Sequence, residues 1–326
     1  MSKLKDIAKA CNVSISTVSL AIHKPHRISR EKKDEILRKA QELGYFSKNK
    51  TVTRVLLVFK DFFKCYMGDY YNNVIYGILE VLHKENITIQ ILSNFDVDYE
   101  QVYENNGIIF VGKTPPEFLA KALNFKMPFV LCGHPDDQNK YSSVHFDVKK
   151  GLHELLDYLI SSGHKKIGLI VGQASHEDFF YKTLVGTFQE TLSRNQLSNS
   201  EKMITTCDYD NLQTVEIALN KLLKQNPTTI CCADDHIAYV SYNILKRWNI
   251  KIPDDISLTG FDDIRLSSFL EPPRPRLTTV SSDPINLGRT AVLQLKKMIL
   301  SSGGFDQKHI ILPVHLKIGA SVKRIR

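Results

Sequence analysis

From Arg54 to the carboxyl terminus, short runs rich in β-branched residues alternate with segments of helical periodicity. Runs such as RVLLVF, GIIFV and KIGLIV are separated by helical patterns such as residues 149–162 and 236–248. Strands and helices spaced in this way predict parallel sheets built from right-handed βαβ units. Roughly ten strands are more than one sheet comfortably holds, so we expect an α/β core of two subdomains with a ligand cleft between them.

Residues 4–44 have a different pattern and predict three short helices. The first helix carries an apolar stripe at helical spacing, formed by Leu4, Ile7, Ala8 and Cys11. Asn12 follows where a tight turn between helices needs a left-handed residue, and Ser14 can then cap the second helix. Ser29 is placed to cap the third helix, and Gly44 to end it. We expect the third helix to turn its apolar residues inward, namely Ile36, Leu37, Ala40 and Leu43.

The second of these helices is unusually polar for a helix in a small bundle. Its apolar residues Ile15, Val18 and Ile22 are expected to share one side. Its other residues include three short hydroxyl side chains that can approach a phosphate or a base edge, Ser16, Thr17 and Ser19. A generic three-helix bundle is the alternative, but the middle helix is too polar for a core helix.

Positive charge is concentrated in the same segment. Residues 1–54 hold 13 Lys or Arg and 5 Asp or Glu, a net charge of +8, which equals the net charge of the whole chain. The remaining 272 residues are therefore neutral overall. A basic patch is often only a solvated surface, but on a helix-turn-helix it is typical of a protein that binds a polyanion.

Several other classes of protein are disfavoured by the sequence. The amino terminus has no apolar segment of signal-peptide length, and no run approaches the ~18 apolar residues of a membrane span, so we expect a cytoplasmic protein without membrane contact. The six cysteines show no C-x-x-C spacing, and Cys231 and Cys232 lie in an apolar run, which favours buried reduced thiols. We expect no metal and no cofactor.

Five ordered motifs carry a family resemblance: DIAKACNVSISTVSLAI, SSGHKKIGLIVG, PTTICCADDHIA, IPDDISLTGFDDIRLSS and PRLTTVSSDPINLGRTAV. Together they resemble the LacI/GalR family of bacterial transcriptional regulators over essentially the whole chain. The resemblance implies an all-α helix-turn-helix head on an α/β core like a periplasmic sugar-binding protein. It also implies a homodimer that binds double-stranded DNA at a near-palindromic operator and a small-molecule effector, a sugar or related metabolite, in the cleft.

The resemblance also implies domain boundaries. We expect a DNA-binding head at 1–46, a linker at 47–53 and a core at 54–326, whose subdomains comprise about 54–163 with 283–312 and about 164–282 with 313–326. Relatives usually have a longer linker containing a hinge helix with a minor-groove Leu wedge. FSKNKTVT is short and has no Leu, so we expect an extended basic linker and regulation through dimer geometry.

In the family, the start of the second helix enters the major groove. Ile15 and Ser16 match the positions that set operator preference, and Thr17 and Ser19 match phosphate contacts. Leu20 stands where many members have an Arg, the side chain best suited to guanine, so we expect a less G-specific half-site. That Leu20 instead packs inward is the open alternative. The remaining expected DNA contacts are Lys5, Ser14, His23, Arg27 and Ser29.

For the effector, the resemblance places Asp262 on ligand hydroxyls or amines, with Asp263 supporting the loop. Asp234 stands where the family commonly has Asn, and the usual ligand-binding Arg is replaced by Thr183 with Lys182 beside it. Two acids and a weakened cation favour a polyol, an amine or a neutral sugar over a phosphorylated one. The expected aromatic contacts are Tyr70, Tyr71 and Tyr209, although Tyr70 and Tyr71 fit ordinary core positions equally well.

Two other functions compete with that of a regulator controlled by a small molecule. An α/β enzyme with a DNA-binding head is disfavoured, because the chain has no G-x-S-x-G, G-x-x-x-x-G-K, H-E-x-x-H or G-x-G-x-x-G motif. A regulator that responds to a protein partner, or to no effector, remains open. We expect a regulator, most simply a repressor, and no enzyme.

Overall fold

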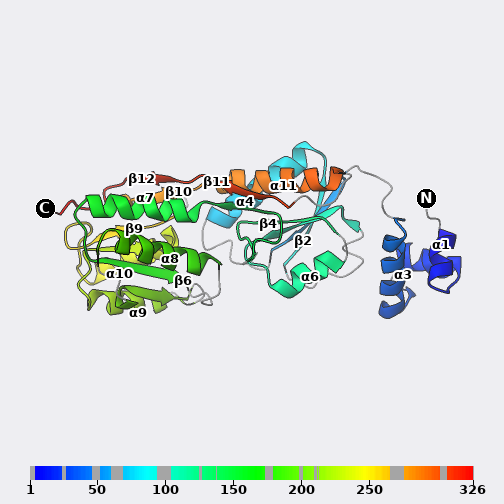
Figure 1. Cartoon of the computed structure of the whole chain (residues 1–326), viewed down its shortest axis with the longest axis horizontal. Coiled ribbons are helices and arrows are strands. Elements are labelled where there is room, and N and C mark those ends of the chain that lie inside the picture. The colour runs from blue at the N-terminus through cyan, green and yellow to red at the C-terminus, as the bar shows by residue number, and fades with distance from the viewer. Residues whose placement is uncertain are drawn as a thin grey trace. The chain divides into compact units, whose positions relative to one another are not determined.

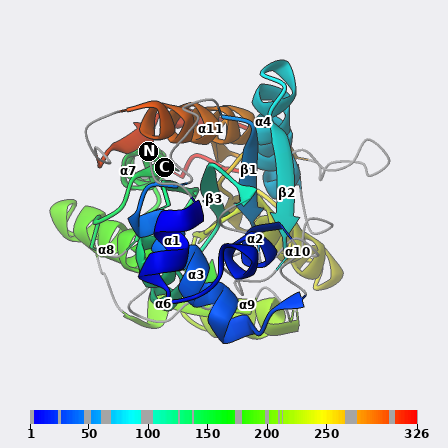
Figure 2. The same cartoon turned by 90° about the vertical axis from the view of Figure 1, so that its right-hand side faces the viewer.

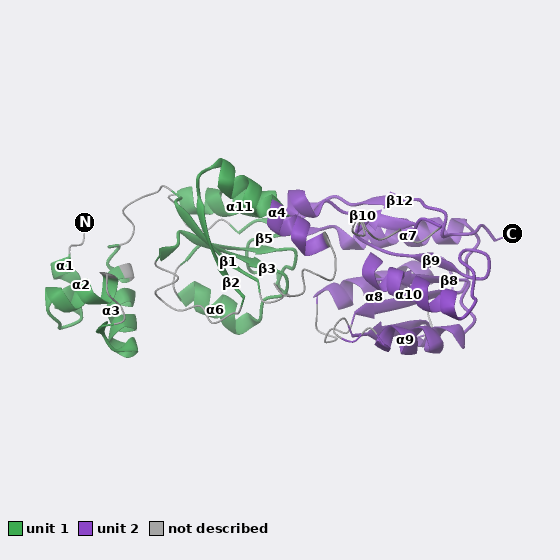
Figure 3. Ribbon diagram, turned by 180° about the vertical axis from the view of Figure 1, so that it is seen from behind, with its two compact units in different colours: residues 1–63, 77–144, 288–309 green, residues 64–76, 145–287, 310–326 purple. Residues whose placement is uncertain are grey.

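The computed structural model describes residues 4–23, 27–45, 52–59, 69–93, 104–124, 127–136, 138–172, 179–197, 201–208, 211, 213–264, 275–301 and 307–325. Contacts divide the chain into two compact units (Figures 1 and 3). The first comprises residues 1–63, 77–144 and 288–309, and the second comprises residues 64–76, 145–287 and 310–326.

The head contains the three expected helices, α1 (Leu4–Ala10), α2 (Ile15–His23) and α3 (Arg30–Glu42), gathered in Figure 2. Ile7, Val18 and Ile36 are completely buried at their centre. Asn12 has the expected left-handed backbone, with φ of 52°. Gly44 also has positive φ, 69°, directly after α3. The sequence therefore predicted correctly where α1 and α3 end.

Ser14 caps α2, because its Oγ accepts a hydrogen bond from the Thr17 backbone N–H at 3.0 Å. We expect Ser14→Ala to cost the head about 1 kcal/mol, and amide exchange in α2 to become about fivefold faster. Hydrogen exchange of the full chain, followed by mass spectrometry, measures this. Ser19→Ala is the control, since Ser19 lies in the same helix away from the cap. Equal acceleration in both variants would contradict the capping role.

The first unit contains a six-stranded sheet in the order β11-β5-β4-β3-β1-β2. The pairs β1/β2, β1/β3, β3/β4 and β4/β5 are parallel, as the sequence predicted. The strands are β1 (Arg54–Val58), β2 (Thr88–Leu92), β3 (Gly107–Val111), β4 (Phe129–Cys132), β5 (Ser143–Phe146) and β11 (His309–Leu312). Figure 3 shows α11 (Pro284–Leu300) and α6 (Pro116–Asn124) on opposite sides of this sheet.

Helix α11 joins this unit from a distant part of the sequence, and ion pairs tie it to α4 (Asp69–Lys84). Arg289 contacts the Glu80 carboxylate with both its Nε, at 2.6 Å, and its Nη2, at 2.5 Å, and Lys296 pairs with Glu85. Lys84 also donates to Glu80 at 2.7 Å. Hydrogen bonds from Lys84 and Arg289 lower the pKa of Glu80, so the cluster stays ionised at neutral pH.

The second unit contains a four-stranded sheet in the order β7-β6-β8-β9, with all three pairs parallel. A two-stranded antiparallel pair, β10/β12, lies in the same unit. Its elements are α7 (Val148–Ser161), β6 (Ile167–Gly172), α8 (Phe179–Arg194), η3 (Glu201–Met203), β7 (Ile204–Cys207), α9 (Gln213–Leu223), β8 (Thr229–Cys232), α10 (Asp235–Arg247), β9 (Ser257–Thr259), β10 (Thr279–Ser281) and β12 (His315–Lys317). Cys231 and Cys232 are buried, free thiols in β8, as expected, and burial raises the pKa of Cys231 to about 12.

The two units differ from the expected subdomains in two places. Residues 69–76 and 145–163 lie in the second unit, whereas we expect them in the first subdomain. For residues 145–163, the reason is that α7 packs against α8, β10 and β12. A Cβ at Gly151 of α7 would lie 2.7 Å from Val314 and 2.8 Å from Val280, so this approach is close. The crossings at 287/288 and 309/310 lie within five residues of those expected.

Among the described residues, none of the helices is long and apolar enough to cross a membrane. The described residues also contain no cluster of His, Cys, Asp or Glu that could hold a metal ion.

Candidate functional site

Helix α2 has one buried side and one side that faces solvent. Val18 and Ala21 are buried in the head. Ser16 is exposed, and Thr17 and Ser19 are half-buried. Ser14 caps α2, and the first turn of the helix lies at the surface. The side chains expected to contact DNA can therefore enter a groove of the double helix.

Two apolar residues of α2 also lie outside the core of the head. Ile15 is 49% exposed, whereas Val18, which we expect on the same side of the helix, is completely buried. Its place as the first residue of the helix explains the difference. Leu20 is half-buried and is not among the side chains that pack on the head core, which favours the outward orientation. In α3, Ile36, Leu37 and Ala40 are buried as expected, but Leu43 lies beyond the helix end and is 37% exposed.

The other residues expected to contact DNA are at the surface where the structure describes them. Lys5, Arg27 and Ser29 are all exposed. His23 ends α2, but its side chain lies outside the described residues. Residues 46–51 are also outside the described part of the chain, so the expected absence of a hinge helix stays a prediction.

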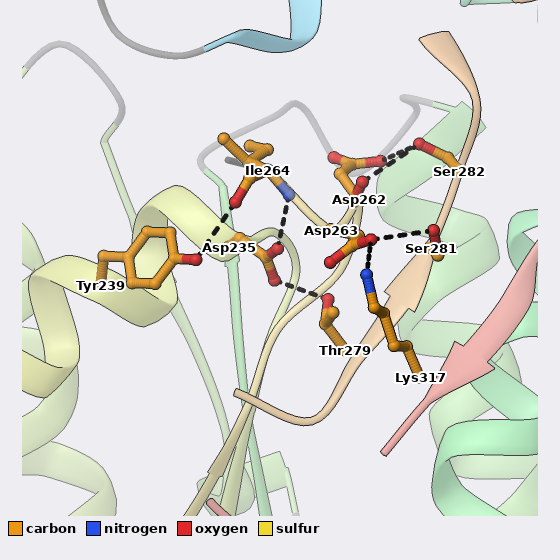
Figure 4. A network of polar contacts seen from close by, with 9 residues as sticks. All are labelled: Asp235, Tyr239, Asp262, Asp263, Ile264, Thr279, Ser281, Ser282 and Lys317. Atoms are coloured by element: carbon orange, nitrogen blue, oxygen red, sulfur yellow. Dashed lines mark hydrogen bonds and ion pairs between the residues drawn. The ribbon is translucent and has the colours of Figure 1, made fainter. Parts of the chain in front are cut away.

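In the second unit, the segment after β9, described as far as residue 264, brings several acids together (Figure 4). Asp262 and Asp263 both have positive φ, 94° and 53°, which is unusual for successive residues other than glycine. The Asp262 N–H donates to the Val280 carbonyl oxygen at 2.7 Å, so the loop runs beside β10. The two acids expected at the effector, Asp234 and Asp262, therefore lie in one unit.

Asp235, which the sequence did not single out, is the buried support of this loop. Its carboxylate is 1% exposed and accepts hydrogen bonds from the Thr279 hydroxyl at 2.6 Å and from the Ile264 N–H at 2.8 Å. Burial raises the pKa of Asp235 well above its ordinary value. A Cβ at Gly260 would lie 2.0 Å from the Asp235 Oδ1, so this position requires glycine. The two adjacent acids in the sequence CADD are the feature from which Asp235 could have been identified.

Asp263 supports the loop, as expected. Its Oδ2 accepts from the Ser281 hydroxyl at 3.1 Å and pairs with Lys317 Nζ at 2.5 Å. Figure 4 shows Lys317 reaching Asp263 from β12. No local pattern points to Lys317, because it lies 54 residues beyond Asp263.

The Asp262 carboxyl is held more loosely than its neighbours. Within the described chain, Oδ1 has one partner, the Ser282 hydroxyl at 3.3 Å. Burial, and next the negative charge of Asp234, raise the pKa of Asp262 to about 7. Asp234 caps α10, accepting from the Ile237 N–H at 2.8 Å. Asn caps a helix equally well, so what Asp234 adds to this site is charge.

This pKa predicts a pH dependence of stability. The folded chain binds the Asp262 proton more tightly than the unfolded chain does, so the ionised form is destabilising. That penalty is absent below about pH 4, grows as pH rises and is complete above pH 7. Asp262→Asn should therefore gain about 2 kcal/mol in unfolding free energy, relative to the wild type, between pH 5 and pH 8. Urea denaturation across this range measures the gain.

The exposed Asp254→Asn serves as the control for this titration, because it removes one carboxylate from the surface of the same unit. A constant difference between Asp262→Asn and the wild type would show instead that Asp262 titrates at an ordinary pKa.

The other residues expected to contact the effector come from α4, from α8 and from outside the described residues. Tyr70 and Tyr71 open α4 as an edge-to-face pair with ring centroids 5.3 Å apart, and both are half-buried. Lys182 is exposed and Thr183 half-buried on α8. Tyr209 lies outside the described residues.

Comparison with known proteins gives two family matches. Residues 3–48 match the model of bacterial regulatory proteins of the lacI family, and residues 156–322 match a periplasmic binding protein-like domain. The HTH-type transcriptional repressor PurR of Aliivibrio salmonicida is 25% identical over 312 residues, covering 90% of each chain.

Two solved structures show the same fold. A complex of the transcriptional regulator CelR with cellobiose has a TM-score of 0.71 at 20% identity, covering 98% of this chain and 100% of its own. The lac repressor dimer, bound to operator and an anti-inducer, has a TM-score of 0.70 at 18% identity and covers 99% of both chains.

Proposed function

Because the chain belongs to the lacI family of bacterial regulatory proteins, we propose that it is a sequence-specific DNA-binding transcription regulator, most simply a repressor, controlled by a small molecule. The observation that carries the DNA-binding role is the solvent-facing side of α2, where Ile15 and Ser16 lie beyond the Ser14 cap. A homodimer would place two such helices in successive major grooves of a near-palindromic operator, in the cytoplasm. The lac repressor, of the same fold, was solved as a dimer on its operator.

The proposed effector is a polyol, an amine or a neutral sugar. Asp262 keeps most of its hydrogen-bonding capacity within the described residues, and the negative charge of Asp234 lies close enough to raise its pKa. Carboxylates accept hydrogen bonds from hydroxyl and ammonium groups and repel phosphate. The cellobiose complex of CelR, a protein of the same fold, supports a neutral sugar.

We propose that effector binding changes cleft closure and thereby the geometry of the dimer. A coupling free energy of about 1–3 kcal/mol is enough for a working switch.

Selection of binding sites from random DNA, followed by footprinting, tests the DNA-binding role. We expect a near-palindrome whose half-site lacks a fixed guanine opposite Leu20. Binding should weaken with salt at a slope near −0.9 per phosphate neutralised. Failure to enrich any sequence would contradict the proposal.

The effector is tested by calorimetry with a panel of neutral sugars, polyols, amines and their phosphorylated counterparts. Saturable binding of an uncharged or cationic member, with a change in operator affinity, supports the proposed class. Tight binding of a sugar phosphate that Lys182→Ala abolishes would refute it. A chain that binds its operator and no panel member would favour control by a protein partner.

A further inference from the structure

We infer that Lys317 is a positioning residue for the effector: by holding Asp263, it keeps the loop of residues 261–264 in the conformation that presents the Asp262 carboxylate. This inference rests on the proposed function, in which that carboxylate binds the ligand. Figure 4 shows the arrangement, with Lys317 on one side of the loop and Asp235 on the other.

The loop needs support because its backbone is strained. Asp262 and Asp263 both occupy the positive-φ region. Each such residue is less stable than in its relaxed conformation, although aspartate tolerates the region better than most residues. Such a conformation persists only where surrounding contacts outweigh the strain.

Backbone contacts hold the segment on either side of the two strained residues. Before them, the Phe261 carbonyl oxygen accepts from the Asp235 N–H at 2.8 Å. After them, the Ile264 N–H donates to the Asp235 carboxylate at 2.8 Å, and the Ile264 carbonyl oxygen accepts from the Tyr239 hydroxyl at 3.1 Å. Between them, the Asp262 N–H bonds the Val280 carbonyl oxygen, and the side chain of Asp263 is the second anchor.

Lys317 supplies the charged contact at that anchor. Of the described residues, it is the one cation that pairs with Asp263, and a charge-assisted hydrogen bond is roughly twice as strong as a neutral one. Lys317 is opposite Thr279 in the β10/β12 register, and Thr279 donates to Asp235. One pair of opposed strand residues therefore supports both halves of the loop.

Lys317 acts on Asp262 through the backbone rather than through its charge. The groups that shift the pKa of Asp262 are its burial, Asp234 and Ser282, and Lys317 is not among them. Removing the ammonium should therefore alter Asp262 by letting the loop relax. A relaxed loop gives the carboxylate more water and more distance from Asp234, and both changes lower its pKa.

The test follows the titration of Asp262 in the full-length chain labelled with ¹³C at the aspartate carboxyl carbons, with Asp262→Asn used to assign the signal. We expect Lys317→Met to lower the apparent pKa of Asp262 by about one unit or more, and Lys317→Arg to retain the wild-type value. Lys221→Met, at an exposed lysine of α9 in the same unit, is the matched control and should change nothing.

An unchanged Asp262 titration in folded Lys317→Met, with circular dichroism like that of the wild type, would overturn the inference. If Lys317→Met does not fold, Asp263→Asn removes the ion pair and keeps an acceptor for Ser281, with the same two outcomes. Because the titration needs no ligand, it is independent of the sugar panel. A wild-type chain that binds no panel member would count against the proposed effector class and leave the loop measurement as it stands.

Discussion

Ser16→Glu in α2 is expected to weaken operator binding at least ~100-fold, because it places a carboxylate on the side of the helix proposed to enter the major groove. Ser16 is exposed and follows the cap residue by two positions, so the new side chain should not disturb the buried core of the head. In a homodimer both half-sites are affected, which multiplies the loss. Fluorescence anisotropy with the selected operator measures the change.

Arg38→Glu distinguishes direct contact from the general positive field. Arg38 is exposed on α3, outside the residues proposed to contact DNA. This variant loses more positive charge than Ser16→Glu does, yet we expect a smaller loss of affinity that disappears as salt is raised. Equal losses in the two variants would mean that α2 has no special place in the interface.

Asp262→Asn is expected to weaken effector binding about 10- to 100-fold while operator affinity without effector is retained. The substitution removes a charged acceptor, and a hydrogen bond to a charged group contributes about 1.5–3 kcal/mol. Asn suits the position, because it tolerates the positive φ found there. Calorimetry with the panel member that the wild type binds measures the affinity, and operator titration with that ligand measures the response.

The same substitution at an exposed site, Asp254→Asn, controls for a general loss of acidic charge in this unit. It should bind effector as the wild type does. If Asp262→Asn and the wild type have equal affinity, Asp262 does not contact the ligand, and the effector site must be sought elsewhere in the chain. Unfolding measurements at the pH of the assay exclude a loss of folded protein as the cause.

Much of the fold could be predicted from local sequence. The apolar stripe of α1, the left-handed Asn12 and the final Gly44 act over a few residues, and each has the expected role in the structure. The parallel strand pairs follow from the alternation of strands and helices. The DNA-contact residues could be nominated because helix-turn-helix geometry relates residues close in sequence.

Local sequence is a poor guide where packing between distant segments decides. Ile15 and Val18 are expected on one side of α2 from their spacing, but Ile15 is the first residue of the helix and lies outside the head core. Contacts place residues 145–163 in the second unit, because the partners of α7 include β10 and β12, which lie more than 100 residues away.

The sequence by itself determined the family and the helix-turn-helix head with its concentrated charge. It also identified Asp234 and Asp262 as candidates for binding the effector. Only the tertiary structure decided how those acids are held. Asp235 lies 29 residues before Ile264, whose N–H it binds, and Lys317 lies 54 residues after Asp263, so no local pattern encodes such contacts. The physical reason is that a strained backbone and a raised carboxyl pKa arise from burial and from neighbours in space, which the order of residues does not give.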